Sequence, residues 1–440
     1  MSFPAYPAYK DSTISWLGRV PSDWSIAPIK AIASCNDEVL SESTDDESVI
    51  EYVEISGVEE GRGITETETL AFGKAPSRAR RVVRHGDVIL STVRTYLRAI
   101  ATISNPPENL VASTGFAVIR PRGVHPGFLG YLLHAEYFMS EVIARSVGIS
   151  YPAINASDLM RLKAPIPSLH EQRAIAAFLD RETAKIDALV EEQKRLIELL
   201  KEKRQAVISQ AVTKGLDPSV PMKDSGVAWL GEVPAHWEVY RNKVLFKEID
   251  DRSDDGVGDL MTVSHLTGVT RRSEKNVNMI LAETLDGYKR GGSGDLVINT
   301  MWAWMGALGV SPCDGLFSPS YNVYRIRNPS RLLPSYYDYL CRVQQHVTEM
   351  RSRSTGIWES RLRLYPDVFL DMRVCVPPPA EQAAIVSTIV RRLGALDALN
   401  TAAEQGIQLL QERRSALISA AVTGKIDVRG LVPQPEVTAA

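Results

Sequence analysis

The sequence predicts an α/β protein built by tandem duplication. We expect two α/β domains, each followed by a long helix, with the two helices pairing as an antiparallel coiled coil with pseudo-two-fold symmetry. Three observations lead to this fold class. The chain has 440 residues, more than a single hydrophobic core usually organises. Similar motifs recur at offsets of 208 to 213 residues. Two long segments poor in glycine and proline carry apolar residues at helical spacing.

The composition is that of a globular protein, with 44% apolar and 23% charged residues. No apolar run reaches about 18 residues, and the N-terminus lacks a signal-peptide pattern, so we expect a cytoplasmic protein without a membrane segment. The four cysteines are far apart in the sequence, which predicts neither a zinc site nor a disulfide framework. With a net charge of -3, any nucleic-acid surface must come from local clusters of basic residues.

The repeat is the strongest internal signal. Residues 10–30 and 223–243 share ten of 21 positions, and from residue 171 to 217, 20 of 47 positions recur at an offset of 210. The recurring pairs include Trp16/Trp229, Trp24/Trp237, Gly86-Asp87/Gly294-Asp295, Thr92/Thr300 and Gly148-Ile149/Gly356-Ile357. Similar offsets indicate a duplicated unit with small loop insertions. The alternative is a duplicated scaffold with no special use.

Each unit begins with a globular part. In the first, short β-like runs at 82–83, 88–90 and 117–119 alternate with turn residues. A long helix follows at 169–213, and we expect Ser168 and Glu171 to form a capping box with both reciprocal hydrogen bonds. Gly215 is a natural C-terminal stop for this helix. Unbroken, it would span ~68 Å at 1.5 Å per residue.

The second helix, 380–423, has weaker signals. Pro378 replaces the capping serine, and Gly394 and Gly406 lower the helical propensity, so a break near either glycine is an open alternative. Connectivity makes the helices antiparallel, with one globular domain near each end. Apolar positions at 3-4 spacing predict the helix-pair contacts. These are Ile186, Leu189, Leu196, Leu200 and Val207 on the first helix, and Leu396, Leu399, Leu410 and Leu417 on the second.

These patterns predict five segments. They are a first domain at 1–168, a central helix at 169–217, a second domain at 218–379, a second helix at 380–427 and a tail at 428–440.

The repeated motifs resemble those of the specificity (S) subunit of type I restriction-modification enzymes. The motif D-S-x-x-x-W-L-G-x-V-P-x-x-W heads each unit, at 11–24 and 224–237, and P-x-x-x-E-Q-x-A-I leads into each long helix, at 167–175 and 377–385. The resemblance implies two target-recognition domains that read the halves of a bipartite DNA site, and helices that set the gap between the halves. It also implies a chain without catalytic residues or bound cofactors. Two methyltransferase subunits and the restriction subunits would be the partners, and these would carry S-adenosylmethionine, ATP and Mg²⁺.

Clusters of basic residues mark the candidate DNA contacts, because arginine and lysine bind phosphates and base edges. The first domain has seven basic residues against one acid between 74 and 98. Its candidates are Lys74, Arg78, Arg80, Arg81, Arg94, Arg98 and Tyr151, and those of the second domain are Arg271, Arg272, Lys275, Trp358, Arg361 and Arg363. A solvated basic face is the alternative.

Other segments help to locate the reading surface. The segments that differ most between the repeats, 44–81 and 257–290, are the expected base readers, whereas the shared head tryptophans are expected to be structural. Trp302 and Trp304 are two residues apart and would share one face of a strand. The stretch 37–68 has twelve carboxylates and one arginine, so we expect it to face solvent or a protein partner.

Enzymatic motifs are incomplete. Residues 105–108 read N-P-P-E, where an adenine methyltransferase would have an aromatic fourth residue. Asp367 and Asp371 with Arg373 resemble a nuclease site only faintly, and no metal-binding pattern occurs. We therefore expect no catalytic residues. A self-sufficient nuclease or methyltransferase and a coiled-coil scaffold without DNA affinity remain as alternatives.

Overall fold

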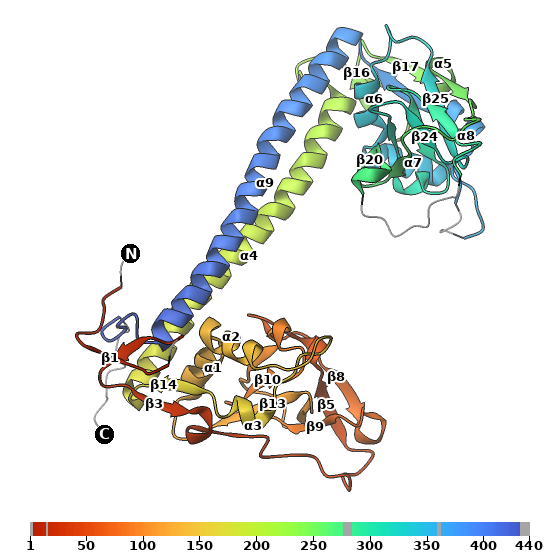
Figure 1. Ribbon diagram of the computed structural model, residues 1–440. Coiled ribbons are helices and arrows are strands. Elements are labelled where there is room, and N and C mark those ends of the chain that lie inside the picture. The colour runs from red at the N-terminus through yellow and green to blue at the C-terminus, as the bar shows by residue number, and fades with distance from the viewer. Residues whose placement is uncertain (1–2, 15, 276–283, 359–361, 432–440) are drawn as a thin grey trace. The chain divides into compact units, whose positions relative to one another are not determined.

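The computed structural model describes residues 3–14, 16–275, 284–358 and 362–431. The chain divides into two compact units, which Figure 1 shows with their elements labelled. The first unit combines residues 1–193 with 405–440, and the second unit is residues 194–404. Each unit therefore contains part of both long helices. The fold class is confirmed as two α/β parts in tandem, each followed by a long helix.

In the first unit, two four-stranded sheets carry most of the strands. One has the order β11-β10-β13-β4 and is antiparallel, and the other has the order β8-β5-β12-β9, with β12 parallel to β5. The strands are β1 Tyr9–Asp11, β2 Arg19–Pro21, β3 Ser25–Pro28, β4 Ala33–Cys35, β5 Val49–Val53, β6 Val58–Glu59, β7 Gly63–Ile64, β8 Glu68–Ala71, β9 Ala79–Val82, β10 Val88–Ser91, β11 Ile100–Thr102, β12 Leu110–Ser113, β13 Phe116–Pro121 and β14 Lys163–Ile166.

The second unit repeats the first sheet as β18-β25-β22-β23, all antiparallel. Within 218–275 and 284–379, the described residues form two-stranded pairs in place of the second sheet, which matches the greater divergence of the repeats in this region. The strands are β15 Met222–Asp224, β16 Glu232–Pro234, β17 Glu238–Arg241, β18 Phe246–Ile249, β19 Met261–Ser264, β20 Gly268–Arg271, β21 Lys289–Gly291, β22 Leu296–Asn299, β23 Leu308–Val310, β24 Gly315–Phe317, β25 Tyr321–Ile326 and β26 Arg373–Val376.

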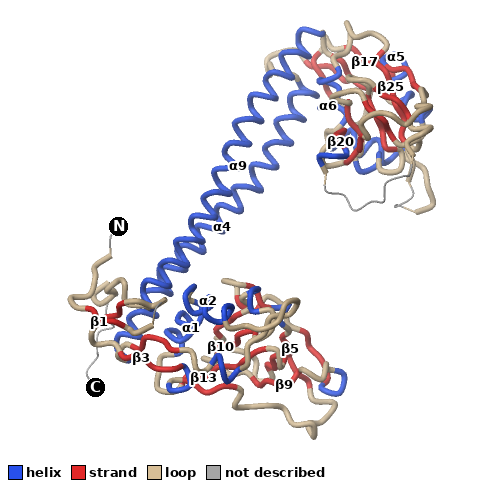
Figure 2. Tube along the Cα trace, in the orientation of Figure 1, coloured by secondary structure: helices blue, strands red, loops and turns tan. Residues whose placement is uncertain are grey.

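Short helices cover the sheets, and two long ones follow the globular parts (Figure 2). The short helices are α1 Pro126–His134, α2 Glu136–Ala144, α3 Ala156–Leu159, α5 Asn242–Leu245, α6 Pro334–Cys341, α7 Gln344–Arg353 and α8 Pro366–Asp371. The long helices are α4 Leu169–Lys214 and α9 Pro379–Val422. The open question about α9 is thereby answered: no break occurs at Gly394 or Gly406. Packing against α4 stabilises a helix that glycine propensity alone would weaken.

In each unit, α4 and α9 run antiparallel. In the first unit, Arg414 of α9 donates to Asp187 of α4 at 2.9 Å. In the second unit, Arg204 of α4 pairs with Asp397 of α9. Both residues of the second pair lie 210 positions from their counterparts in the first, so the two ion pairs are duplicates. The repeat therefore extends to the contacts between the helices.

The expected stripe is only partly right. Ile186 and Leu417 are buried together in the core of the first unit, and Leu410 packs against them. Leu396 packs against the core of the second unit. Three predicted contacts are wrong, because Leu189, Leu196 and Leu399 are exposed. A straight α-helix drifts by about 20° per heptad, so a 3-4 pattern followed over many turns leaves the contact face. The remaining two, Leu200 and Val207, are half-buried.

The shared head and helix motifs form one hydrogen-bonded hub in each unit. The Ser168 hydroxyl accepts the Glu171 N–H at 3.3 Å, but the Glu171 carboxylate does not complete the capping box. It accepts instead from Trp24 Nε1 at 3.0 Å and from the Tyr6 hydroxyl at 2.6 Å. In the second unit, Glu381 accepts from Trp237 Nε1 at 3.1 Å. The expectation of two reciprocal capping bonds is thus corrected, because the buried indole and phenol compete for the same carboxylate.

The neighbouring glutamine and the repeated Gly-Asp pair are also structural. The Gln172 amide accepts the His125 N–H at 2.8 Å, and Gln382 accepts that of Leu333 at the same distance. Asp87 and Asp295 are buried and receive bidentate hydrogen bonds of 2.8 to 3.0 Å. Their donors are Arg120 and Arg325, respectively. These shared residues therefore build the scaffold.

Candidate nucleic-acid interface

The basic cluster of the first unit is interleaved with the acidic stretch. Arg84 pairs with Glu38 at 2.9 Å, and Arg78 pairs with Glu54. A hydrogen bond from Arg84, and a second one from Arg120 with a smaller effect, hold the pKa of Glu38 below its ordinary value. The side chains of these two glutamates remain 39% and 40% exposed, so the acidic stretch faces solvent as expected and also pairs with the predicted DNA-binding region. Strand order brings the two segments together, although they are separate in sequence.

Four more basic candidates of this cluster occupy different surroundings. Arg98 pairs with Glu136 and, at 3.2 Å, with Glu60. Arg80 lies over the Phe72 ring with its guanidinium 4.7 Å from the centroid. Arg81 is half-buried, and its Nε has no hydrogen-bond partner among the described residues, whereas Lys74 is exposed.

Arg94 and Tyr151 are the two candidates that the fold brings together. Arg94 is exposed and has no carboxylate partner among the described residues. Its guanidinium lies over the Tyr151 ring, 4.6 Å from the centroid. Its backbone N–H donates to the Pro152 carbonyl at 2.7 Å, which fixes the segment 92–98 against the loop 146–152. An exposed arginine stacked on an exposed tyrosine offers both a cation and an aromatic face to a ligand.

In the second unit, three basic candidates lie at the end of β20 and in the turn that follows. Arg271 pairs with Asp259 at 3.2 Å, Arg272 begins a 3₁₀ turn, and Lys275 donates to the Thr267 hydroxyl at 2.6 Å. Burial lowers the pKa of the Lys275 ammonium.

The other candidates of this unit lie near residue 356. Trp358 is exposed, and Arg363 forms a backbone bridge to Thr355 with two hydrogen bonds of 3.0 Å. A cavity of about 470 Å³ adjoins this loop. Its lining consists of Met301, Trp302, Thr355, Gly356, Leu362, Arg363 and Tyr365. Arg361 lies outside the described residues.

The two tryptophans near this loop correct a further expectation. Strand β22 ends at Asn299, and residues 303–305 form a 3₁₀ turn, so Trp302 and Trp304 do not share a strand face. Trp302 is exposed, whereas the Trp304 indole donates to the Met301 carbonyl at 3.0 Å.

Sequence reasoning missed Ile149 and Ile357 as possible contact residues. They are the most exposed large apolar side chains in the part of the chain that the structure describes, at 103% and 93%. The signal was present in the repeated Gly-Ile pairs, but composition alone does not show which shared residues are buried.

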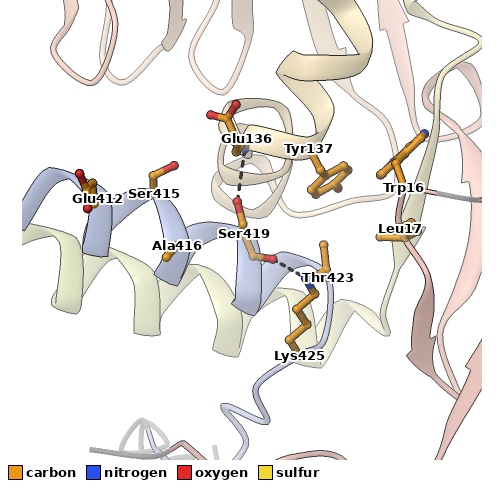
Figure 3. A pocket seen from close by; sticks show the side chains of 10 residues that line it. All are labelled: Trp16, Leu17, Glu136, Tyr137, Glu412, Ser415, Ala416, Ser419, Thr423 and Lys425. Carbon is orange, nitrogen blue, oxygen red and sulfur yellow. Dashed lines mark hydrogen bonds between the residues drawn. The ribbon is translucent and has the colours of Figure 1, made fainter. Parts of the chain in front are cut away.

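A second kind of surface also occurs in both units. In the first, Trp16, Tyr137 and Ser419 line a groove of about 540 Å³ beside α9 (Figure 3). The Ser419 hydroxyl accepts the Glu136 N–H at 3.3 Å at the groove wall. In the second unit, Ser209 and Gln345 line a groove of about 420 Å³ beside α4. Ser209 and Gln345 are the repeat equivalents of Ser419 and Tyr137, so we call these surfaces the twin grooves.

Neither a metal-binding cluster nor a membrane-spanning helix occurs among the described residues. No three His, Cys, Asp or Glu side chains within 3–14, 16–275, 284–358 and 362–431 lie close enough to hold a metal ion. All four cysteines are free thiols. Asp371, from the nuclease-like pattern, is paired with Arg241 at 3.0 Å. Every helix in the described part of the chain is too short or too polar to cross a bilayer.

Comparisons with known proteins agree with this architecture. Residues 21–199 match the type I restriction modification DNA specificity domain. A putative type I restriction enzyme MjaX specificity subunit of Methanocaldococcus jannaschii is 25% identical over 252 residues, covering 54% of this chain and 56% of the relative. The HindI specificity subunit of Haemophilus influenzae is 32% identical over 106 residues, covering 23% of each chain.

Over residues 21–199 the chain is thus similar to type I restriction-modification specificity subunits. Its alignments span about half the length of the first curated relatives, 56% and 49%. Among solved structures, a chain of a type I R-M system studied for complex assembly and conformational transition superposes with a TM-score of 0.64 at 21% identity. The HsdS subunit from Thermoanaerobacter tengcongensis gives 0.55 at 20% identity. Each superposition covers 92% of this chain and 98% of the other, and shows that this chain shares their fold.

Proposed function

We propose that this chain is the DNA-recognition subunit of a type I restriction-modification complex and has no catalytic activity of its own. Each globular part, 1–168 and 218–379, reads one half of a bipartite double-stranded DNA site. The segments 169–217 and 380–427 set the gap between the halves. The observation that carries the proposal is the pair of loops near residues 149 and 357, where exposed aromatic and apolar side chains recur in both units.

Arg94 and Tyr151 are the contact residues best supported in the first unit, and Trp358 and Arg363 in the second. The guanidinium of Arg94 is free of carboxylates in the described residues, so it is available to a phosphate or a base edge. Arg78 and Arg271 would have to exchange a carboxylate partner for DNA. Both pairs are exposed, and exposed ion pairs are weak, so this exchange has a small cost.

The twin grooves support a partner that binds twice. Both are lined by the same helix positions, represented by Ser209 and Ser419, so each suits the same element of a partner present in two copies. We assign them to two methyltransferase subunits, with restriction subunits joining the assembled complex. S-adenosylmethionine, ATP and Mg²⁺ would bind to those partners.

Selection from a pool of random duplexes tests the proposal. The purified chain with its methyltransferase subunits should enrich one motif with two constant blocks and a fixed gap. The chain alone, supplied with DNA and S-adenosylmethionine, should neither methylate nor cleave. Turnover by the isolated chain would instead support a self-sufficient enzyme, and failure of the complex to enrich any motif would support a scaffold without DNA affinity.

A further inference from the structure

Ile149 and Ile357 stand out because they occupy the same repeat position and are almost completely exposed, at 103% and 93%. A single exposed apolar side chain is ordinary on a protein surface and requires no explanation. Here, however, the two most exposed large apolar side chains of the described residues occupy equivalent positions in the two repeats. Each follows a glycine, Gly148 or Gly356, at the tip of a loop.

The same backbone frame holds both tips. In the first unit, the Ile154 N–H donates to the Thr92 carbonyl at 2.9 Å, and in the second, the Leu364 N–H donates to the Thr300 carbonyl at 3.2 Å. The sides of the first loop are closed by two hydrogen bonds between Val147 and Ala153, of 2.9 and 3.0 Å. Ile149 is therefore presented to solvent by a hydrogen-bonded loop, with little ordering required on binding. Ile357 follows a loop base that is hydrogen-bonded in the same way, between Thr355 and Arg363.

Amphipathic and basic groups surround the tips. Tyr151 is exposed beside Ile149, with Arg94 over its ring, and Trp358 is exposed beside Ile357. The segments 92–99 and 145–155 contain three arginines and no acid. Two of them, Arg98 and Arg145, are paired with glutamates, which leaves Arg94 as the free cation among these described residues. In the second unit, the described residues of 300–307 and 353–364 include Arg353 and Arg363 and no acid, and Glu359 lies outside the described residues.

We propose that Ile149 and Ile357 are DNA wedges, each of which enters the base stack of the duplex at one step. Arg94 and Arg363 then lie near the phosphates. The inference rests on the proposed function. A side chain shared by both units must contact a feature common to both half-sites, and halves of different sequence share stacked base pairs and phosphates. Inserted aliphatic side chains are known to unstack and kink a base step, and isoleucine is among those used.

The test uses the complete complex with its methyltransferase subunits, without S-adenosylmethionine. Each duplex carries the selected site with 2-aminopurine at a single position. The methylated adenines are not replaced, because methyltransferases flip their target base and would unstack it independently of the wedge. The variants are Ile149→Ser and Ile357→Ser, and the matched controls are Ile149→Leu and Ile357→Leu. Both positions are exposed, so all four chains should keep the unfolding midpoint of the wild type.

We expect wild-type binding to raise 2-aminopurine fluorescence severalfold at one step in or beside each half-site. Ile149→Ser should abolish the fluorescence increase at one half-site alone. It should also weaken binding by roughly tenfold, which corresponds to losing about half of the free energy gained by burying an isoleucine side chain. Ile357→Ser should do the same at the other half-site, and both leucine variants should behave as wild type.

Four results would overturn the wedge. The first is specific binding by a complex that unstacks no base apart from the methylated adenines. The second is unstacking that persists in both serine variants. Either result would leave the proposed function intact and refute the wedge. Loss of the methyltransferase subunits from a serine variant, measured by size-exclusion chromatography, would make the tip a protein contact. Absence of any sequence-specific binding by the wild-type complex would refute the proposed function and the wedge together.

Discussion

At the scale of single residues, the motif glutamates Glu171 and Glu381 explain why the two repeated motifs of each unit recur together. Each accepts a hydrogen bond from the head tryptophan of its own unit, so the head motif and the helix motif are parts of one contact. The surroundings differ, however. Glu171 is buried and also binds Tyr6, whereas the Glu381 side chain is 26% exposed and binds the exposed His236.

We expect Glu171→Ala to lower the free energy of unfolding by about 2–4 kcal/mol, because it leaves the Trp24 indole and the Tyr6 hydroxyl buried without partners. The matched variant, Glu381→Ala, should cost about 1–2 kcal/mol, since water can reach the vacated position. Urea denaturation of both variants measures the difference. Equal losses would show that the two hubs do not differ as described.

His346 makes the second unit acid-sensitive. It is fully buried, its Nδ1–H donates to the Cys341 carbonyl at 3.0 Å, and burial lowers its pKa to about 4. Below about pH 6.5 the unfolded chain binds a proton that the folded chain does not, so the free energy of unfolding falls as the pH drops from 6.5 to about 4.

His346→Gln should remove about 1–3 kcal/mol of this fall, because glutamine stays neutral across the range. The check is the free energy of unfolding at pH 7 and at pH 4.5 for both chains. His134, whose pKa burial also lowers to about 4, should keep a residual slope in the variant. The same fall in the variant and the wild type would contradict the assignment.

The candidate site was predictable only in part at this scale. The sequence locates Arg94 and Tyr151 in basic and aromatic segments, but not their stacking, because the contact joins loops more than 50 residues apart. It also does not show that Arg78 and Arg84 are paired with glutamates of the acidic stretch. Such pairings depend on strand order, which hydrophobic periodicity does not specify.

At the scale of elements, the paired helices show how tertiary contacts override local propensity. Gly394 and Gly406 lie inside an unbroken α9. A Cβ added at Gly394 would meet no atom within 4 Å, and one added at Gly406 would meet only Gln193 Oε1, at 4.0 Å. Neither glycine is therefore required for close packing.

Gly394→Ala should stabilise the protein by about 0.5–1 kcal/mol, because alanine loses less backbone entropy on forming a helix. Urea denaturation measures the shift. Gly130→Ala is the matched control within helix α1, where the new Cβ would collide with the Thr102 hydroxyl, so we expect it to destabilise. Destabilisation by Gly394→Ala would mean that the glycine has a role that its surroundings do not show.

At the scale of the whole molecule, the sequence predicted the architecture because a duplication repeats every signal. The tandem α/β organisation and the two long helices followed from repeat offsets and from the scarcity of glycine and proline. The strand order and the pairing of the second sheet could not be predicted from the sequence. Its strands are short, and several come from the segments where the repeats diverge. Leu189, Leu196 and Leu399 are exposed, which shows that positions counted at 3-4 spacing turn away from the contact face along a long helix.

The spacer role of the long helices has its own test. Helices α4 and α9 are continuous through both units, so each can transmit a change in length. A second copy of residues 196–199 adds ~6 Å at 1.5 Å per residue. DNA rises ~3.4 Å per base pair, so the gap between half-sites should grow by one or two base pairs with both half-sites unchanged. An unchanged gap, measured by duplex selection, would show that the helices do not set the spacing.

We propose that each unit reads one half of a bipartite site. Single-molecule sequencing of methylated adenines in host DNA tests it most directly, by comparing the wild-type chain with a chain substituted in the divergent segment 257–275. We expect the wild type to produce one motif with two constant blocks separated by a gap of fixed length, and the substituted chain to alter one block alone. A continuous motif, or a change in both blocks at once, would show that the units do not read separate half-sites.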